Sequence, residues 1–178
     1  IYEKIFETYT KKQWGVDPSQ LDTSVIKRIP VRLSRDTRYF NDKYQGIPSR
    51  GYTRMCENMA ASRNIKLLLN TDYREVMKDI SCDWLIYTGA PDEFYDYMYG
   101  KLAYRSINFV FETHDREEYQ AAPVVNYPVD YDFTRITEFK KLTGQKHPKT
   151  TICKEFPCDE GEPYYPFPTA EHKARFAM

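Results

Sequence analysis

Residues 106–157 decide the fold, because this stretch holds four runs rich in β-branched and aromatic residues that Pro, Gly and Asp interrupt. The short links between the runs favour antiparallel pairing of neighbouring strands. The sequence therefore predicts a largely antiparallel sheet in the second half of the chain. The four runs read SINFVFET (106–113), APVVNYP (122–128), TRITEFKKL (134–142) and TTICKEFP (150–157).

Helical signals lie mostly upstream of this stretch. Apolar residues repeat at helical spacing in 1–13, and Pro18 suits the first turn of a second, short helix. The i, i+3, i+4, i+7 spacing in 52–62 predicts a helix with one buried face. Pro91 opens a brief helix that should extend to about residue 99.

Three further segments read as strands, and the whole chain reads as α+β: a largely antiparallel sheet with flanking helices. We expect one compact unit over 1–178, because no repeat or clear linker divides it. The proline-rich tail ends in a weakly helical pattern. The additional strands are expected at 25–32, at 65–76 and at 83–88.

Composition describes a folded, neutral chain with one basic end. Of the 178 residues, 29% are charged and 41% apolar, and the net charge is zero. Residues 1–54 nevertheless hold 11 Lys or Arg against 6 Asp or Glu. A local basic region in a neutral chain points to a local anionic ligand, and it argues against a surface that coats nucleic acid.

Several function classes lack their signatures. The chain has no apolar run of eighteen residues, no secretory leader pattern, no GxGxxG or Walker loop, no HExxH and no nucleophile elbow. Its four Cys lack CxxC spacing, so we expect neither a metal site nor a disulfide. A glycosidase-like carboxylate pair has no marker in the sequence. The first residue is Ile, which suggests a piece of a longer protein.

The first fifty residues combine aromatic rings with arginines. Rings stack on flat bases and sugars, and guanidinium groups grip phosphate oxygens in pairs. This combination suits a nucleoside diphosphate sugar, although most aromatics and arginines in any protein serve packing or solvation. The residues concerned are Tyr9, Trp14, Arg28, Arg32, Arg35, Arg38, Tyr39 and Tyr44.

Nine segments in order resemble the UDP-galactopyranose mutase family, and together they span nearly the whole chain. Any one of them would be weak, whereas the ordered set is specific. They are YTKKQWG (9–15), IKRIPVR (26–32), RYFNDKYQGIP (38–48), GYTRM (51–55), LNTDY (69–73), IYTGAPDEFYDY (86–97), LAYRS (102–106), TRITEFK (134–140) and EPYYPFP (162–168).

The resemblance implies an isomerase, a cytoplasmic flavoenzyme that interconverts UDP-galactopyranose and UDP-galactofuranose for cell-surface polysaccharides. It implies that reduced FAD is the nucleophile, with flavin N5 attacking the anomeric carbon of galactose and displacing UDP. The substrate partner is then UDP-galactose, with no nucleic acid and no membrane insertion. Members of this family often pair, so the resemblance also implies a homodimer.

The resemblance further implies a set of substrate-binding residues. Tyr9 should stack on uracil, Trp14 should lie near the sugar, and Asn126 should reach the uracil. Arg28 should lie close to substrate and flavin, while the later arginines and the tyrosines should contact the diphosphate; Tyr164 and Tyr165 stay open as alternatives. The set is Tyr9, Trp14, Arg28, Tyr39, Arg105, Asn126, Arg135, Tyr164 and Tyr165. Arg32, Arg35, Arg38 and Arg50 are expected to be surface charges, and Tyr44, Tyr52 and Tyr73 to pack.

The sequence departs from the family pattern in lacking the FAD-binding GxGxxG segment. Thr88 and Gly89 fall where the family chain passes near the flavin, but two residues do not hold FAD. We therefore expect these 178 residues to be the substrate-binding region of a flavoenzyme, without bound flavin or activity of their own. The alternatives are a non-catalytic nucleotide-sugar or glycan binding module, a single-stranded nucleic acid binder, which the zero net charge disfavours, and a plain interaction domain.

Overall fold

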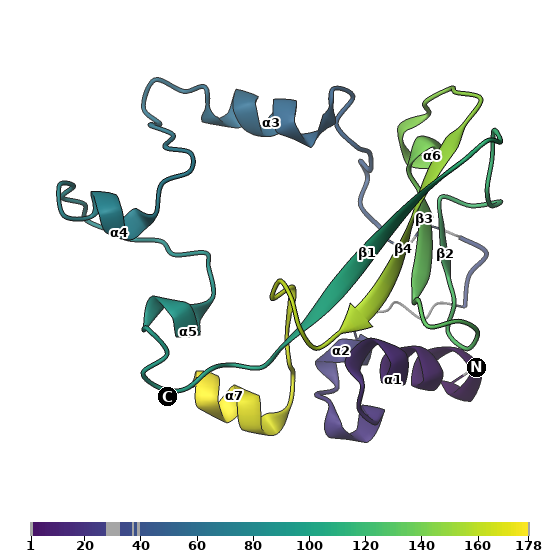
Figure 1. Cartoon of the computed structure of the whole chain (residues 1–178), viewed down its shortest axis with the longest axis horizontal. Helices are drawn as coiled ribbons and strands as arrows, with labels where there is room; N and C mark the ends of the chain where they lie inside the picture. Colours follow the sequence, from purple (N-terminus) through teal and green to yellow (C-terminus); the bar gives the residue numbers. More distant parts are fainter. Residues whose placement is uncertain (1, 28–32, 37, 39, 178) are drawn as a thin grey trace. The chain divides into compact units, whose positions relative to one another are not determined.

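The computed structural model describes residues 2–27, 33–36, 38 and 40–177 (Figure 1). Contacts between residues group the chain into two units. The first unit comprises residues 1–41 and 90–178, and the second comprises residues 42–89. That residues 1–178 act together as one substrate-binding region stays a prediction.

A five-stranded antiparallel sheet organises the first unit (Figure 1). Its order is β2-β3-β4-β1-β5, and every neighbouring pair is antiparallel. The predicted α+β class and the four predicted strands are confirmed, whereas the two-residue fifth strand was not expected. The strands are β1 (Tyr104–His114), β2 (Val124–Asn126), β3 (Arg135–Glu138), β4 (Thr150–Cys158) and β5 (Tyr165–Pro166).

Helices flank this sheet. A π-helical turn, η1 (Tyr2–Glu7), runs into α1 (Thr8–Trp14), which ends where Gly15 adopts a left-handed φ of 71°. Gly15 donates its N–H to the carbonyl of Lys11, and a residue with a Cβ would be strained at that φ. The run predicted as a strand over 134–142 is a strand followed by a helix. The other helices are η2 (Pro18–Gln20), α2 (Ser24–Lys27), α5 (Pro91–Phe94), α6 (Phe139–Thr143) and α7 (Ala170–Phe176).

The two faces of the sheet carry different side chains, because neighbouring residues of a strand point to opposite faces. One face holds the core, where Phe133, Ile136 and Ile152 are buried together. Burying each isoleucine contributes about 1.5–3 kcal/mol. Arg135 and Glu155 alternate with these residues along β3 and β4, so they occupy the opposite face, the one toward α1.

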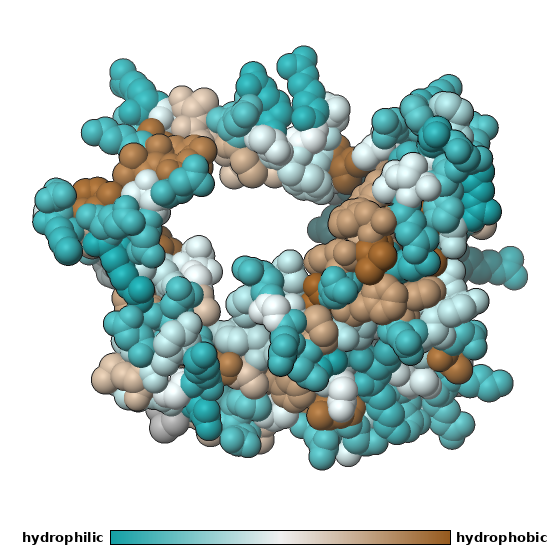
Figure 2. Space-filling view, viewed as in Figure 1, coloured by the Kyte–Doolittle hydropathy of each residue, from teal (hydrophilic) through white to brown (hydrophobic). Residues whose placement is uncertain are grey.

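That opposite face is partly uncovered beyond the reach of α1. Phe109 and Phe111 of β1 are 40% and 63% exposed, and the Phe111 ring stacks on Phe139 at 6.1 Å between centroids. Figure 2 shows apolar side chains gathered over the long strands of the sheet.

The second unit contains two helices, α3 (Gly51–Ala60) and α4 (Tyr73–Val76), and no strand. The helix predicted over 52–62 is confirmed, but the prediction of a buried face on it is wrong, because none of its residues is buried. The predicted strands at 65–76 and 83–88 are also wrong. A strand needs a hydrogen-bonded neighbour, and neither segment has one among the described residues.

The strand predicted at 25–32 is wrong in its first part, because residues 24–27 form α2. Residues 28–32 lie outside the described residues. The brief helix predicted over 91–99 begins at Pro91 as expected and ends at Phe94, where turns replace it.

Candidate functional site

A row of polar side chains crosses three strands on the face toward α1. Asn126 of β2 pairs with Arg135 of β3, and Arg135 pairs with Glu155 of β4. Residues directly opposite each other in an antiparallel pair lie on the same face and within contact distance. The sheet register therefore places an amide, a guanidinium and a carboxylate side by side.

Arg135 is the centre of this row. Its Nη2 donates to the hydroxyl of Tyr9 at 3.0 Å, which joins β3 to α1. Its Nε lies 3.1 Å from Oε2 of Glu155, an ion pair that lacks hydrogen-bond alignment. Tyr9 and Glu155 thus contact one edge of the guanidinium, and about a third of the side chain is exposed.

The two charges of this pair respond differently to burial. Burial lowers the pKa of Arg135, but the nearby Tyr9 and Glu155 outweigh that effect, so its pKa lies above the ordinary value. Burial raises the pKa of Glu155, and Arg135 offsets the rise only in part. Arg135 therefore stays charged, while Glu155 accepts a proton more readily than a free carboxylate would.

Arg135, Tyr9 and Asn126 line a pocket of about 890 Å³ between η1, α1 and the sheet, and Glu155 lies outside its lining. A volume of this size is in the range of small-molecule sites. Four predicted substrate-binding residues meet there, although up to 156 positions separate them: Tyr9, Asn126, Arg135 and Tyr165. The other lining residues are Ile5, Phe6, Thr10, Phe40, Val124 and Pro128.

Tyr165 links this pocket to Trp14. The Trp14 ring is buried and meets the edges of Tyr165 and Phe167, with centroids 6.2 and 5.9 Å apart. Trp14 thus anchors α1 on the sheet behind the pocket. Of the two tyrosines left open by the sequence, Tyr165 lines the pocket, whereas Tyr164 is half-exposed and packs against Phe109.

Arg105 lies beside Tyr165 without lining the pocket. It pairs with Tyr165 across β1 and β5, and it is buried. Its Nε donates to the carbonyl of Gln13 at 3.1 Å, and its guanidinium forms an ion pair with Asp159. A cation at the C-terminal end of a helix interacts favourably with the helix dipole. In this structure, Arg105 therefore holds the end of α1.

The remaining predicted residues lie outside the described residues or in the second unit. Arg28 and Tyr39 lie outside the described residues. Thr88 and Gly89 belong to the second unit, where both are exposed, and a Cβ on Gly89 would meet the Tyr87 hydroxyl. That the flavin passes near Thr88 and Gly89, as the resemblance implies, stays a prediction.

Six lining residues, and the carboxylate of Glu155 beside Arg135, were not predicted as site residues from the sequence. Ile5 lies four positions before Tyr9, a helical spacing that places both on one side of the helix and could have identified it. Phe6 lies three positions before Tyr9 and shares that signal. Glu155 carries no signal in its local sequence, because only the strand register brings it to Arg135.

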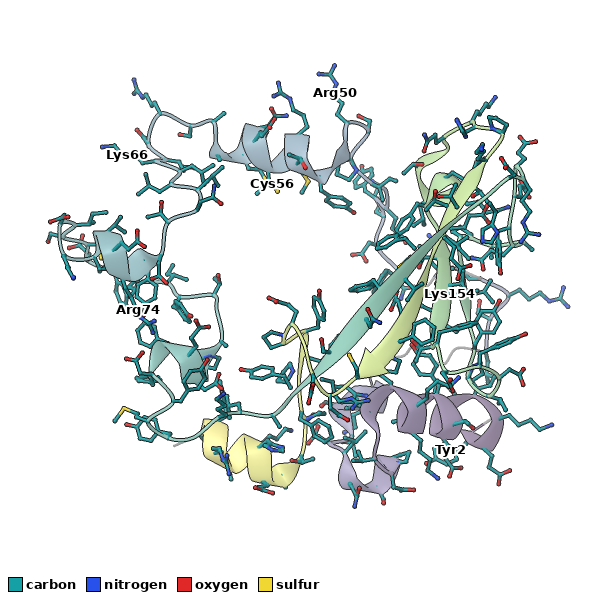
Figure 3. The ribbon with its side chains drawn as sticks, in the orientation of Figure 1. Tyr2, Arg50, Cys56, Lys66, Arg74 and Lys154 are labelled. Atoms are coloured by element: carbon teal, nitrogen blue, oxygen red, sulfur yellow. The ribbon has the colours of Figure 1, made fainter. Side chains whose placement is uncertain are left out.

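The arginines expected on the surface are there where the structure describes them. Arg35, Arg38 and Arg50 are exposed, and Arg38 forms an ion pair with Asp36. Figure 3 shows Arg50 and Lys66 projecting from the ribbon of the second unit. Arg32 lies outside the described residues. Arg35 and Arg38, which belong to the first unit, do not line the 890 Å³ pocket.

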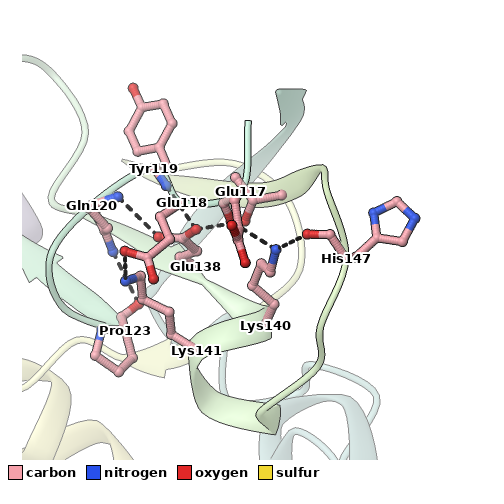
Figure 4. Close-up of polar contacts among 10 residues, drawn as sticks. Glu117, Glu118, Tyr119, Gln120, Pro123, Glu138, Lys140, Lys141 and His147 are labelled. Atoms are coloured by element: carbon pink, nitrogen blue, oxygen red, sulfur yellow. Dashed lines mark hydrogen bonds and ion pairs between the residues drawn. The ribbon is translucent and has the colours of Figure 1, made fainter. Parts of the chain in front are cut away.

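A buried carboxylate at the other end of the sheet is structural. Glu138 is fully buried and accepts hydrogen bonds from the amides of Tyr119 and Gln120 and from the Thr150 hydroxyl (Figure 4). Burial alone would raise its pKa, but these hydrogen bonds outweigh burial and hold it below the ordinary value. Glu138 thereby fastens the loop before β2 to the start of β4.

No other pocket or residue cluster in the described part of the chain combines predicted site residues with a cavity as the 890 Å³ pocket does. A pocket of about 330 Å³ between α5 and α7 contains none of the predicted residues. The part of the chain that the structure describes holds no cluster of three or more His, Cys, Asp or Glu suited to a metal ion. In the same part, no helix combines the length and the apolar character needed to cross a membrane.

Comparison with known proteins gives one consistent result. Residues 4–178 match the family model described as UDP-galactopyranose mutase. A probable UDP-galactopyranose mutase of Klebsiella pneumoniae is 42% identical over 173 residues, which cover 93% of this chain and 44% of the relative.

Two further relatives are named for different nucleotide sugars. A dTDP-fucopyranose mutase of Escherichia coli is 37% identical over 176 residues, covering 93% of this chain and 47% of the relative. A UDP-galactopyranose mutase of Mycoplasma pneumoniae is 32% identical over 193 residues, covering 98% and 48%. The chain spans about half the length of the curated relatives that it matches.

Proposed function

Because the chain belongs to the UDP-galactopyranose mutase family, we propose that it forms the substrate-binding part of an isomerase that interconverts UDP-galactopyranose and UDP-galactofuranose. The observation that carries the proposal is the convergence of Tyr9, Asn126, Arg135 and Tyr165 on one pocket. Those four residues supply a stacking ring, an amide, a fixed positive charge and a phenol, which are the groups that a nucleoside diphosphate needs.

Each side chain has a physical role in this proposal. The Tyr9 ring stacks on the uracil, and Asn126 reaches its polar edge with an amide that can both donate and accept. Arg135 grips the diphosphate, since guanidinium binds phosphate oxygens through charge-assisted hydrogen bonds. Tyr165 donates its hydroxyl to a phosphate oxygen, with Trp14 behind it.

Binding of the diphosphate also serves the chemistry. When the bond from the sugar to UDP breaks, negative charge grows on the phosphate oxygens. A cation already held in place stabilises that charge without reorganisation. Arg135 meets this requirement, because Tyr9 and Glu155 fix its guanidinium before any ligand enters.

The flavin chemistry that the resemblance implies is assigned to the rest of a mutase. We propose that FAD is held chiefly by segments outside residues 1–178, so that the isolated chain neither retains flavin nor turns over substrate. The check is the absorbance of the purified chain: a flavin band near one equivalent per chain would contradict this part of the proposal. The cytoplasmic location and the homodimer are likewise proposals, and light scattering tests the second.

Calorimetric titration with UDP tests the proposed binding. Arg135→Ala removes charge-assisted hydrogen bonds worth roughly 1.5–3 kcal/mol each, so affinity should fall about 10- to 100-fold. Tyr9→Ala should weaken binding through lost stacking. Arg50→Ala, which removes an exposed charge of the second unit, is the matched control and should leave affinity unchanged. Equal titrations for all four proteins would refute the assignment.

The same titration addresses the nucleotide. One relative is named for a dTDP sugar and others for a UDP sugar. UDP-galactose should therefore bind more tightly than a dTDP sugar if the uridine is the natural base. The non-catalytic nucleotide-sugar module remains the alternative, and it is favoured if the complete protein binds UDP-galactose but yields no furanose product.

A further inference from the structure

Lys12 occupies an unusual position on α1. Its ammonium group donates to three backbone carbonyls, those of Tyr127, Asp130 and Phe133, at 2.6, 3.1 and 3.3 Å. A lysine has three N–H donors, so this set satisfies all of them. Burial lowers the pKa of Lys12, and Asp130 and Asp132 offset part of that effect.

The three carbonyls belong to the loop 127–133 between β2 and β3. The loop is closed by the Tyr127 N–H, which donates to the carbonyl of Thr134 at 2.8 Å. Its aromatic rings pack on one another, with Tyr131 stacked on Phe133 at 4.9 Å and Tyr127 edge-on at 5.0 Å. Tyr131 takes a left-handed φ of 63°, which turns the backbone so that its carbonyls gather around one cation.

Lys12 connects two walls of the pocket without lining it. Its helix carries Tyr9 one turn earlier, on the first wall. The loop it holds is flanked by Asn126 and Arg135, on the second wall. The hydrogen bond between Tyr9 and Arg135 spans the two walls, so its length depends on where α1 sits against the loop.

We propose that Lys12 is a positioning residue that sets the spacing between Tyr9 and Arg135 for one nucleoside diphosphate. The inference rests on the proposed function of the pocket. Without the ammonium group, three carbonyls lose their donor, and the turn of α1 that carries Tyr9 loses its tie to the loop, while Trp14 and Arg105 still hold the C-terminal end of the helix. A stacking ring and a phosphate clamp that move relative to each other no longer match a rigid ligand, and affinity falls.

The chain offers a matched control in Lys140. Its ammonium group likewise donates to three backbone carbonyls, those of Glu117, His147 and Lys149, at the other end of the sheet. Lys140→Met therefore removes the same kind of contact without touching the pocket. Both lysine variants should lower the midpoint of thermal unfolding, so stability alone does not separate a positioning role from a structural one.

The experiment compares Lys12→Met with Lys140→Met in two measurements. The first is the affinity for UDP, which should fall at least tenfold in Lys12→Met and stay within twofold in Lys140→Met. The second is the NMR signal of the Tyr9 ring in tyrosine-labelled chain, identified by its loss in Tyr9→Phe. That signal should move in Lys12→Met and keep its position in Lys140→Met.

Coupling to Tyr9 completes the test. Tyr9→Phe removes the acceptor of the Arg135 hydrogen bond and should weaken UDP binding in the wild-type background. In the Lys12→Met background, Tyr9→Phe should cause little further loss of UDP affinity, because Tyr9 and Arg135 are no longer held together. If Lys12→Met does not fold, Lys12→Gln, which keeps two donors, is measured by the same criteria.

Two results would overturn the proposal. One is a Lys12 variant that binds UDP like the wild type. The other is a Tyr9 signal that stays unchanged in it. If the wild-type chain itself binds no UDP, the proposed function fails, and the Tyr9 signal still decides the role of Lys12.

Discussion

Replacing Glu138 by Gln should destabilise the first unit by about 2–4 kcal/mol, although it changes only one atom. In the structure, Oε1 accepts from the Tyr119 amide at 2.9 Å and from the Thr150 hydroxyl at 2.6 Å, and Oε2 accepts from the Gln120 amide at 3.0 Å. Gln supplies one oxygen and one NH₂ group. Whichever way the amide is turned, a backbone N–H faces another donor.

The magnitude follows from that mismatch. A buried donor left without an acceptor costs about 1–3 kcal/mol, and the hydrogen bonds that remain lose the added strength that a charged acceptor gives. Glu118→Gln is the control, because it alters an ion pair between Lys141 and the Glu118 side chain, which is 68% exposed. The resulting loss in the free energy of unfolding should stay below about 1 kcal/mol.

Urea unfolding provides the assay, with Trp14 fluorescence as the signal in a Trp84→Phe background, because Trp14 is buried and Trp84 is exposed. The pH dependence has a defined sign. The pKa of Glu138 is lowered on folding, so its stabilisation is present above the unfolded pKa and is lost as pH falls through the folded pKa. The difference in the free energy of unfolding between the wild type and Glu138→Gln should then become smaller at acidic pH. Equal unfolding midpoints for the Glu138 and Glu118 variants at neutral pH would refute this reasoning.

Four further predictions concern the pocket and its support. UDP-galactose, whose phosphates are both esterified and stay ionised, should bind more tightly as pH falls through the raised pKa of Glu155, because the protonated carboxyl no longer competes for Arg135. In calorimetry, Glu155→Gln should make the affinity for UDP-galactose independent of pH in this range. An affinity that changes with pH equally in Glu155→Gln and in the wild type would contradict the pairing. The same raised pKa means that the stability due to Glu155 falls as pH rises from its unfolded to its folded pKa, which urea titrations at several pH values would detect. Trp14→Ala should cost about 3–5 kcal/mol in urea unfolding, and a loss under 1 kcal/mol would mean that the ring is not an anchor. Gly15→Ala should cost roughly 1–2 kcal/mol, because the left-handed φ strains any Cβ and the added atom lies 3.4 Å from the Arg105 guanidinium; an unchanged thermal midpoint would argue against that turn.

The sheet could be predicted from the sequence because its strands find their partners within the first unit. Segments 65–76 and 83–88 carry equally good strand signals and yet form none. Local propensity states which backbone a segment favours, but a strand exists only when a neighbour supplies hydrogen bonds. The same reasoning applies to α3, whose spaced apolar residues predict a buried face that nothing among the described residues covers.

Four of the ten residues that line the pocket could be predicted from the sequence, and the rest depended on geometry. Tyr9 and Arg135 were identified by residue type and by resemblance, which need no register. Glu155 and Lys12 were not, because their importance comes from the strand pairing and from the shape of loop 127–133. Charged residues in a strand and on a helix are common, and their sequence neighbours do not distinguish them from solvated ones.

The leucines at 67–69 carry a practical consequence. They are 61%, 57% and 71% exposed in a segment without strand partners, and Trp84 and Ile86 are exposed still further. Exposed apolar segments of this kind are recognised by chaperones and promote irreversible aggregation during purification. The chain should therefore scatter more light as its concentration rises.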